Sequence, residues 1–95
     1  MLVNVTANIN DLLQQQEEQK IAVELSWYHK DDSKGQSVVG ECYLATPIDE
    51  VVHILNVSLD EFISCETYVT ENALKQLNVN YDCNEYEYSI GLVRP

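Results

Sequence analysis

The chain has 95 residues and carries 16 acidic against 5 basic side chains, which gives a formal net charge of -11 at neutral pH. This length fits a single domain, residues 1–95, that can bury one modest core but not a deep enzyme cleft. Nucleic acids and anionic membranes are polyanions, so the charge argues against direct binding to either and favours a basic protein as partner.

The first 20 residues predict a helical extension, and the next segment predicts a strand. Residues 10–19 are mostly polar helix formers, with Asn8 or Asn10 as candidate caps, so we expect one short and loosely docked helix. From residue 21 to 28 apolar and polar side chains alternate, which is typical of a strand with one buried face. That face is expected to carry Ile21, Val23, Leu25 and Trp27.

A polar, glycine-containing loop at 29–36 separates this strand from a second one at 37–44, so we expect an antiparallel hairpin. One face of the second strand is expected to carry Val38, Cys42 and Leu44, and the other Val39, Glu41 and Tyr43. Thr46-Pro47 then predicts a helix that Thr46 caps and Asn56 ends.

The remaining segments predict a turn, a strand, a short helix and a last strand. A turn or a single helical turn is expected at 58–61, the third strand at 62–69, a short helix capped by Thr70, and the last strand at 85–93. The last strand is expected to carry Tyr86, Tyr88, Ile90 and Leu92 on one face and Glu85, Glu87 and Ser89 on the other. Antiparallel strands with helices to one side belong to the α+β class. We therefore expect a small antiparallel sheet of about four strands with short helices packed on one face, formed by residues 21–95.

Metal and catalytic sites are not supported by the residues that usually form them. Cys42, Cys65, Cys83, His29 and His53 are too widely spaced for a structural zinc site. The sequence has no glycine-rich phosphate loop and no serine-nucleophile motif, and its adjacent acid pairs do not face each other across a substrate. We therefore expect no catalytic residue, no metal and no cofactor, and a binding protein rather than an enzyme.

The polar faces of the predicted strands are more informative about function. Between residues 36 and 93, Lys75 is the single basic side chain against ten acidic ones. The polar strand positions are Glu24, Ser26, Tyr28, Glu41, Tyr43, Glu85 and Glu87. On a sheet that is covered on one side only, they would form a contiguous acidic and aromatic patch. An ordinary solvated face is the alternative, but tyrosines among carboxylates favour a binding surface because aromatic residues are enriched at interface hot spots.

From Leu25 onward, roughly three quarters of the chain, the sequence resembles the cloacin-type immunity proteins, which neutralise nuclease bacteriocins. The resemblance depends on LSWYHK with a following KG and GE, an apolar helix around Val51 and Val52, a cysteine in SCETYV, and NEYEYS near the end. It implies an antiparallel sheet whose exposed face binds a basic toxin nuclease domain, with the position of Cys65 in that region. The first 20 residues and the lack of a tryptophan neighbouring Cys65 depart from the family pattern. Related acidic proteins serve as immunity partners of contact-dependent growth inhibition toxins.

The sequence therefore predicts an acidic bacterial immunity protein that binds and neutralises a cognate basic nuclease toxin, an RNase. The alternative is an acidic nucleic-acid mimic that inhibits a DNA-binding or CRISPR-type enzyme, and a toxin gene directly upstream would favour immunity. A cytoplasmic location is expected, since no export signal is recognisable and the odd, widely spaced cysteines suit free thiols. The expected toxin-binding residues are Glu24, Tyr28, Glu41, Tyr43, Cys65, Glu66, Glu85 and Glu87.

Overall fold

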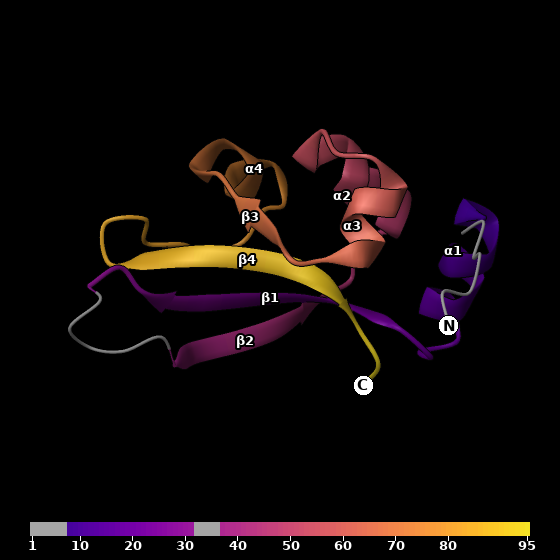
Figure 1. The fold of residues 1–95 in the computed structure, drawn as a ribbon, viewed down its shortest axis with the longest axis horizontal. Coiled ribbons are helices and arrows are strands. Elements are labelled where there is room, and N and C mark those ends of the chain that lie inside the picture. The colour runs from indigo at the N-terminus through magenta and orange to yellow at the C-terminus, as the bar shows by residue number, and fades with distance from the viewer. Residues whose placement is uncertain (1–7, 32–36) are drawn as a thin grey trace.

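The structure, a computed structural model, describes residues 8–31 and 37–95. Within these ranges it contains an antiparallel four-stranded sheet in the order β2-β1-β4-β3 (Figure 1). The strands are β1 (Ala22–His29), β2 (Val38–Leu44), β3 (Thr67–Val69) and β4 (Tyr86–Val93). The helices are α1 (Ile9–Glu17), α2 (Ile48–Leu55), α3 (Leu59–Ser64) and α4 (Glu71–Gln76). The α+β class predicted from the sequence is confirmed.

The core lies between the two central strands and the helices α2, α3 and α4, which pack on one face of the sheet. On this covered face, Leu25 of β1 lies directly beside Ile90 of β4, and the two side chains are 1% and 0% exposed. Burial of one such side chain contributes about 1.5–3 kcal/mol to folding. The helices supply the buried side chains of Ile48, Val51, Phe62, Ala73 and Leu74. Period-two alternation predicted the inward faces of β1 and β4 correctly.

Helix α1 makes hydrogen bonds to the rest of the domain that the sequence did not indicate. Asn8 caps it by accepting a hydrogen bond from the backbone N–H of Asn10 at 3.0 Å. No residue of the helix is fully buried, but the side chain of Gln16 bridges to the segment before α2. Its Nε2 donates to the Thr46 carbonyl at 2.9 Å, and its Oε1 accepts from the Ile48 N–H at 3.0 Å. These two hydrogen bonds are a contact that the expectation of a loosely docked helix did not include.

The start of α2 also differs from the prediction. Thr46 was expected to cap this helix, but Pro47 occupies the N-cap position and makes no side-chain cap hydrogen bond. The Gln16 amide instead accepts from Ile48, one of the N–H groups that a helix start leaves without an intrahelical partner. Asn56 ends the helix as predicted, in the left-handed conformation with φ 56°.

The predicted strand at 62–69 is wrong in its first half, which belongs to α3. The Ser58 hydroxyl accepts from the Glu61 N–H at 3.2 Å and so caps this helix. Phe62 is 1% exposed and fills the core from the helix. The strand β3 therefore keeps only the three residues 67–69. The pattern Ser-x-x-Glu was the sequence signal for this helix start.

Trp27 lies on the covered face as predicted, but it is only partly buried. It pairs with Gly40 of β2, and its indole ring occupies the space beside that glycine: an added Cβ would lie 2.6 Å from the ring atom Cε2. The register shifts between Trp27 and Tyr28, so Tyr28 pairs with Val38 and Val39 is the extra residue. Because of this bulge, the prediction that Val38 shares a face with Cys42 is wrong.

Candidate protein-binding face

The helices α2, α3 and α4 leave the other face of the sheet uncovered, and the strand register shows which side chains share it. Residues that pair directly across antiparallel strands point to the same side of the sheet. The register pairs Glu24 with Tyr43, Ser26 with Glu41 and Ser89, Tyr28 with Glu87, and Tyr68 with Ser89. Val38, which pairs with Tyr28, lies on the same side. We define the open face as the polar and aromatic residues of this side together with the residue before β3: Glu24, Ser26, Tyr28, Glu41, Tyr43, Glu66, Tyr68, Glu87 and Ser89.

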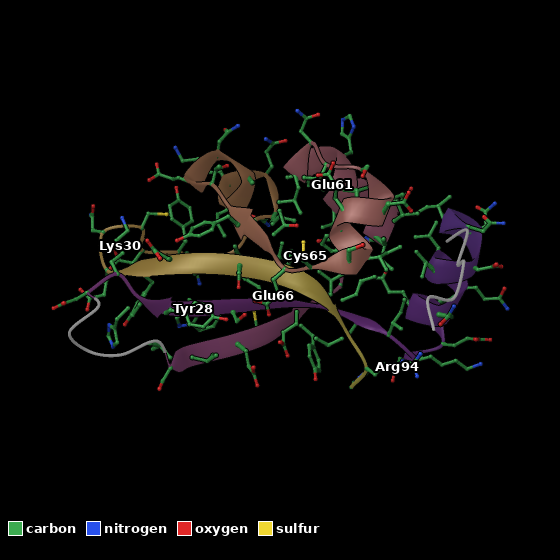
Figure 2. All side chains as sticks on the ribbon, viewed as in Figure 1. Tyr28, Lys30, Glu61, Cys65, Glu66 and Arg94 are labelled. Atoms are coloured by element: carbon green, nitrogen blue, oxygen red, sulfur yellow. The ribbon has the colours of Figure 1, made fainter. Side chains whose placement is uncertain are left out.

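Small side chains form the centre of the open face. Ser26 is 3% exposed, and its hydroxyl lies 3.4 Å from that of Ser89 on the neighbouring strand. Ser89 donates to the Glu66 carboxylate at 3.4 Å. A Cβ added at Gly91 would lie 3.4 Å from Glu66 Cγ, so the Glu66 side chain extends across β4 (Figure 2). Glu66 therefore reaches the centre of the open face although it lies outside the strands.

The carboxylates of the open face are close enough to repel one another. Partial burial raises the pKa of the Glu24 carboxyl above its ordinary value, and the negative charges of Glu41 and Glu66 raise it further. A carboxyl next to like charges holds its proton more tightly because ionisation adds to the repulsion. This repulsion is relieved when a cation binds, so the face is electrostatically suited to a basic ligand.

Tyrosines and carboxylates meet again beside β3 and β4. A hydrogen bond to the Glu87 carboxylate raises the pKa of the Tyr68 hydroxyl, so Tyr68 remains a neutral donor. Tyr28, Glu66, Tyr68, Glu87 and Ser89 line a hollow of about 340 Å³. Tyr68 itself is strongly exposed, at 66%. An aromatic wall next to a carboxylate is a suitable environment for a lysine or arginine side chain.

Within the described residues, basic side chains do not offset the negative charge of the open face. The ion pairs there join Lys20 to Glu18, His29 to Glu85 and Lys75 to Glu71, so they involve no carboxylate of the open face. Figure 2 shows the other two described bases, Lys30 and Arg94, at opposite ends of the sheet. Among residues 8–31 and 37–95, the open face is therefore an acidic surface with basic residues only near its ends.

Two of the expected binding residues lie apart from the open face. Glu85 belongs to the turn before β4, and its carboxylate lies 3.4 Å from the buried Nδ1 of His29, without hydrogen-bond alignment. Cys65 is exposed at the end of α3, where its thiol donates to the Glu61 carbonyl at 3.7 Å. The structure brings the other six expected residues together: Glu24, Tyr28, Glu41, Tyr43, Glu66 and Glu87.

Sequence reasoning missed Tyr68 and Ser89 as members of this face. Ser89 was assigned to the polar side of the last strand but was not selected as a binding residue. Tyr68 alternates with Glu66, so period-two spacing could have placed them together. The third strand was predicted to begin at residue 62, so the pairing of Tyr68 with Ser89 was not recognised.

The described residues offer little for metal or thiol chemistry. None of their His, Cys, Asp and Glu side chains form a group of three or more that could hold a metal ion. Partial burial raises the pKa of the Cys42 thiol, and nearby Glu24 raises it further, which disfavours the reactive thiolate. None of the helices in the described ranges is long and apolar enough to span a bilayer.

Comparison of the chain with models of protein families, with curated proteins and with solved structures found no match. Its function must therefore be argued from the chemistry of the open face and from the resemblance in its sequence motifs.

Proposed function

We infer that this chain is an immunity protein that binds a cognate basic nuclease toxin, an RNase, and neutralises it through the open face. One observation gives the main support for this proposal. The carboxylates of Glu24, Glu41, Glu66 and Glu87 share one surface, and no basic side chain in the described residues pairs with them. The resemblance of the sequence to cloacin-type immunity proteins supports the same function.

Charge accounts for recognition of such a partner. A nuclease must present positive charge to hold the phosphates of its RNA substrate. Attraction between that surface and a chain of net charge -11 raises the rate of encounter. Rapid encounter is what an inhibitor needs if it is to reach the toxin before the toxin reaches RNA. The inhibitor then acts by occupying the substrate path or the active site.

Tyrosines account for the stability of the complex. Charge complementarity mainly sets the association rate and specificity, whereas affinity depends on a few well-buried anchors, often aromatic. Tyr43 and Tyr68 are 57% and 66% exposed in the free protein, so both have surface to bury against a partner. The hollow beside Tyr68 offers a basic side chain an aromatic wall and two carboxylates, those of Glu66 and Glu87.

A pair of matched charge reversals tests the proposal. Where the gene directly upstream encodes a nuclease domain, that domain is the probe, and the assays are RNase inhibition and association rate by stopped flow. Glu41→Lys with Glu87→Lys changes the open face and is expected to slow association by about tenfold or more. The control, Glu17→Lys with Glu18→Lys, makes the same charge change at the C-terminal end of α1, where positive charge suits the helix dipole. The control should retain inhibition.

Other outcomes would assign recognition elsewhere. If the α1 reversals abolish inhibition and the open-face reversals do not, the toxin-binding surface lies on the N-terminal helix and the proposal is wrong. If the protein also inhibits unrelated DNA-binding enzymes with similar affinity, it is a nucleic-acid mimic. An immunity protein is expected to bind one cognate toxin.

A further inference from the structure

The outer edge of β2 is a second unusual surface of this domain. In the order β2-β1-β4-β3, β2 is a terminal strand, and among the described residues it pairs only with β1. The other terminal strand, β3, has three residues and lies between α3 and α4 in the chain, whereas β2 has seven. A terminal strand presents a row of unpaired backbone N–H and C=O groups, which can pair with a strand of another chain.

Strand β2 is exposed on its faces as well as at its edge. None of its residues is buried, while β1 and β4 both have buried residues. Val38, Val39 and Tyr43 are 48%, 42% and 57% exposed. Figure 1 shows β2 on the side of the sheet farthest from α2, α3 and α4. Apart from Gly40, which accommodates Trp27, and Leu44, which packs against the core at its edge, β2 contributes little to the core, so packing alone does not explain why this long strand is present.

Most of the devices that prevent edge pairing are missing from β2. Natural edge strands are usually protected by lysines, prolines, bulges or short length. In β2 the single charge is Glu41, there is no proline, and the bulge is confined to the Val38–Val39 end. From Gly40 to Leu44 the register with β1 is uninterrupted. This regular half is therefore the part to which another strand can pair.

We propose that an extended segment of the basic partner adds to the outer edge of β2 as a fifth strand, along Gly40–Leu44. This proposal depends on the proposed function for the sign of the partner's charge. Glu41 and Tyr43 of β2 also belong to the open face, so a partner on that face reaches this edge without a gap. Alternate side chains of the added strand would lie beside Glu41 and Tyr43 and should be basic. The others would lie beside Cys42 and Leu44 and should be apolar.

A second copy of this chain fits the edge less well. Each copy carries a net charge of -11, and two β2 strands paired around a two-fold axis through Glu41 would place like charges opposite each other. A basic strand has the complementary charge. The occupant is therefore assigned to the partner rather than to a homodimer.

Model peptides and amide hydrogen exchange test this inference. The probe is a short peptide of alternating lysine and valine, titrated into isotope-labelled protein at low salt. At saturation, alternate amides of Glu41–Leu44 should exchange about tenfold or more slowly, because they gain strand hydrogen bonds. The amides of Thr67–Val69 on the other terminal strand serve as an internal control and should not change. The same peptide with every amide N-methylated keeps its charge but cannot pair, so it should not produce the protection.

Variants of the protein separate the effect of charge from that of pairing. Glu41→Gln should weaken binding of the lysine–valine peptide by about 1.5- to 5-fold, the range of one cross-strand charge pair. Glu71→Gln on α4 makes the same charge change away from this edge and should leave the affinity unchanged. A glutamate–valine peptide should not bind.

Four results would overturn the inference, and each is distinguishable from failure of the proposed function. Protection, in the free protein, of the alternate Glu41–Leu44 amides that face away from β1 would mean that a second copy or another part of the chain already occupies the edge. Equal binding of the N-methylated peptide, or unchanged exchange at Glu41–Leu44, would mean that basic peptides contact only the open face. Absence of binding would remove the edge as a site. The toxin assay with open-face reversals stands or falls separately in every case.

Discussion

Replacement of Gln16 tests how the N-terminal helix is attached to the domain. The Gln16 amide makes two hydrogen bonds, to the Thr46 carbonyl and from the Ile48 N–H. One intramolecular hydrogen bond contributes about 0.5–1.5 kcal/mol, so the pair contributes about 1–3 kcal/mol. Gln16→Ala is therefore expected to lower the free energy of unfolding by about 2 kcal/mol. In a domain of this size that corresponds to a fall in Tm of about 8–16 °C.

Urea denaturation with two companion variants measures this effect. Gln14→Ala replaces an exposed glutamine on the same helix and corrects for helix propensity. Gln16→Glu keeps the acceptor for the Ile48 N–H but loses the donor to Thr46, so its stability should lie between those of the wild type and Gln16→Ala. If Gln16→Ala and Gln14→Ala agree within about 0.5 kcal/mol, the amide bridge does not hold α1 in place and the reasoning is refuted.

Three further measurements test the electrostatics and the strand packing. The association rate with the toxin domain should fall steeply as salt rises, and a rate independent of salt would contradict electrostatic steering. Burial and repulsion raise the pKa of the Glu24 carboxyl in the folded state, so the protonated carboxyl favours folding. This contribution to the free energy of unfolding is complete below pH 4.5 and is lost as the pH rises through the folded pKa. Glu24→Gln should therefore stabilise the protein at neutral pH but not below pH 4.5, and an equal gain at both would show that neither burial nor repulsion raises the pKa of Glu24. Gly40→Ala should displace the Trp27 ring at a cost of about 1–3 kcal/mol, and unchanged tryptophan fluorescence and stability would show that the ring does not occupy that space.

The parts of the fold that follow from local pattern were predictable. Alternation of apolar and polar residues placed Leu25 and Ile90 in the core, and Thr70 was identified as a helix cap; its hydroxyl accepts from the Ala73 N–H at 3.2 Å. Both signals depend on residues close together in the chain. The order β2-β1-β4-β3 was not predictable in this way, because strand neighbours are set by packing between distant segments.

The candidate site was predictable to a similar extent. Glu24, Tyr28 and Glu41 follow directly from strand alternation, which fixes the face of a residue within a regular strand. Glu85 was misplaced because the strand begins one residue later, at Tyr86, and the chain turns before it. The short segment Phe62–Ser64 suits a helix or a strand by periodicity alone, and the cap signal from Ser58 to Glu61 was not used, so the β3 side of the face was predicted incorrectly.

The position of β4 in the sheet has a consequence for how the protein is made. Ser26 of β1 lies beside Ser89 of β4, 63 residues later in the chain. A nascent chain can form the β1–β2 hairpin early, but the second edge of β1 stays unpaired until β4 has been synthesised. Closing long loops costs entropy, and domains built on distant pairings fold slowly. A chain that stops before residue 86 should therefore be an aggregation-prone and protease-sensitive fragment, and only the completed chain should present the open face to a partner.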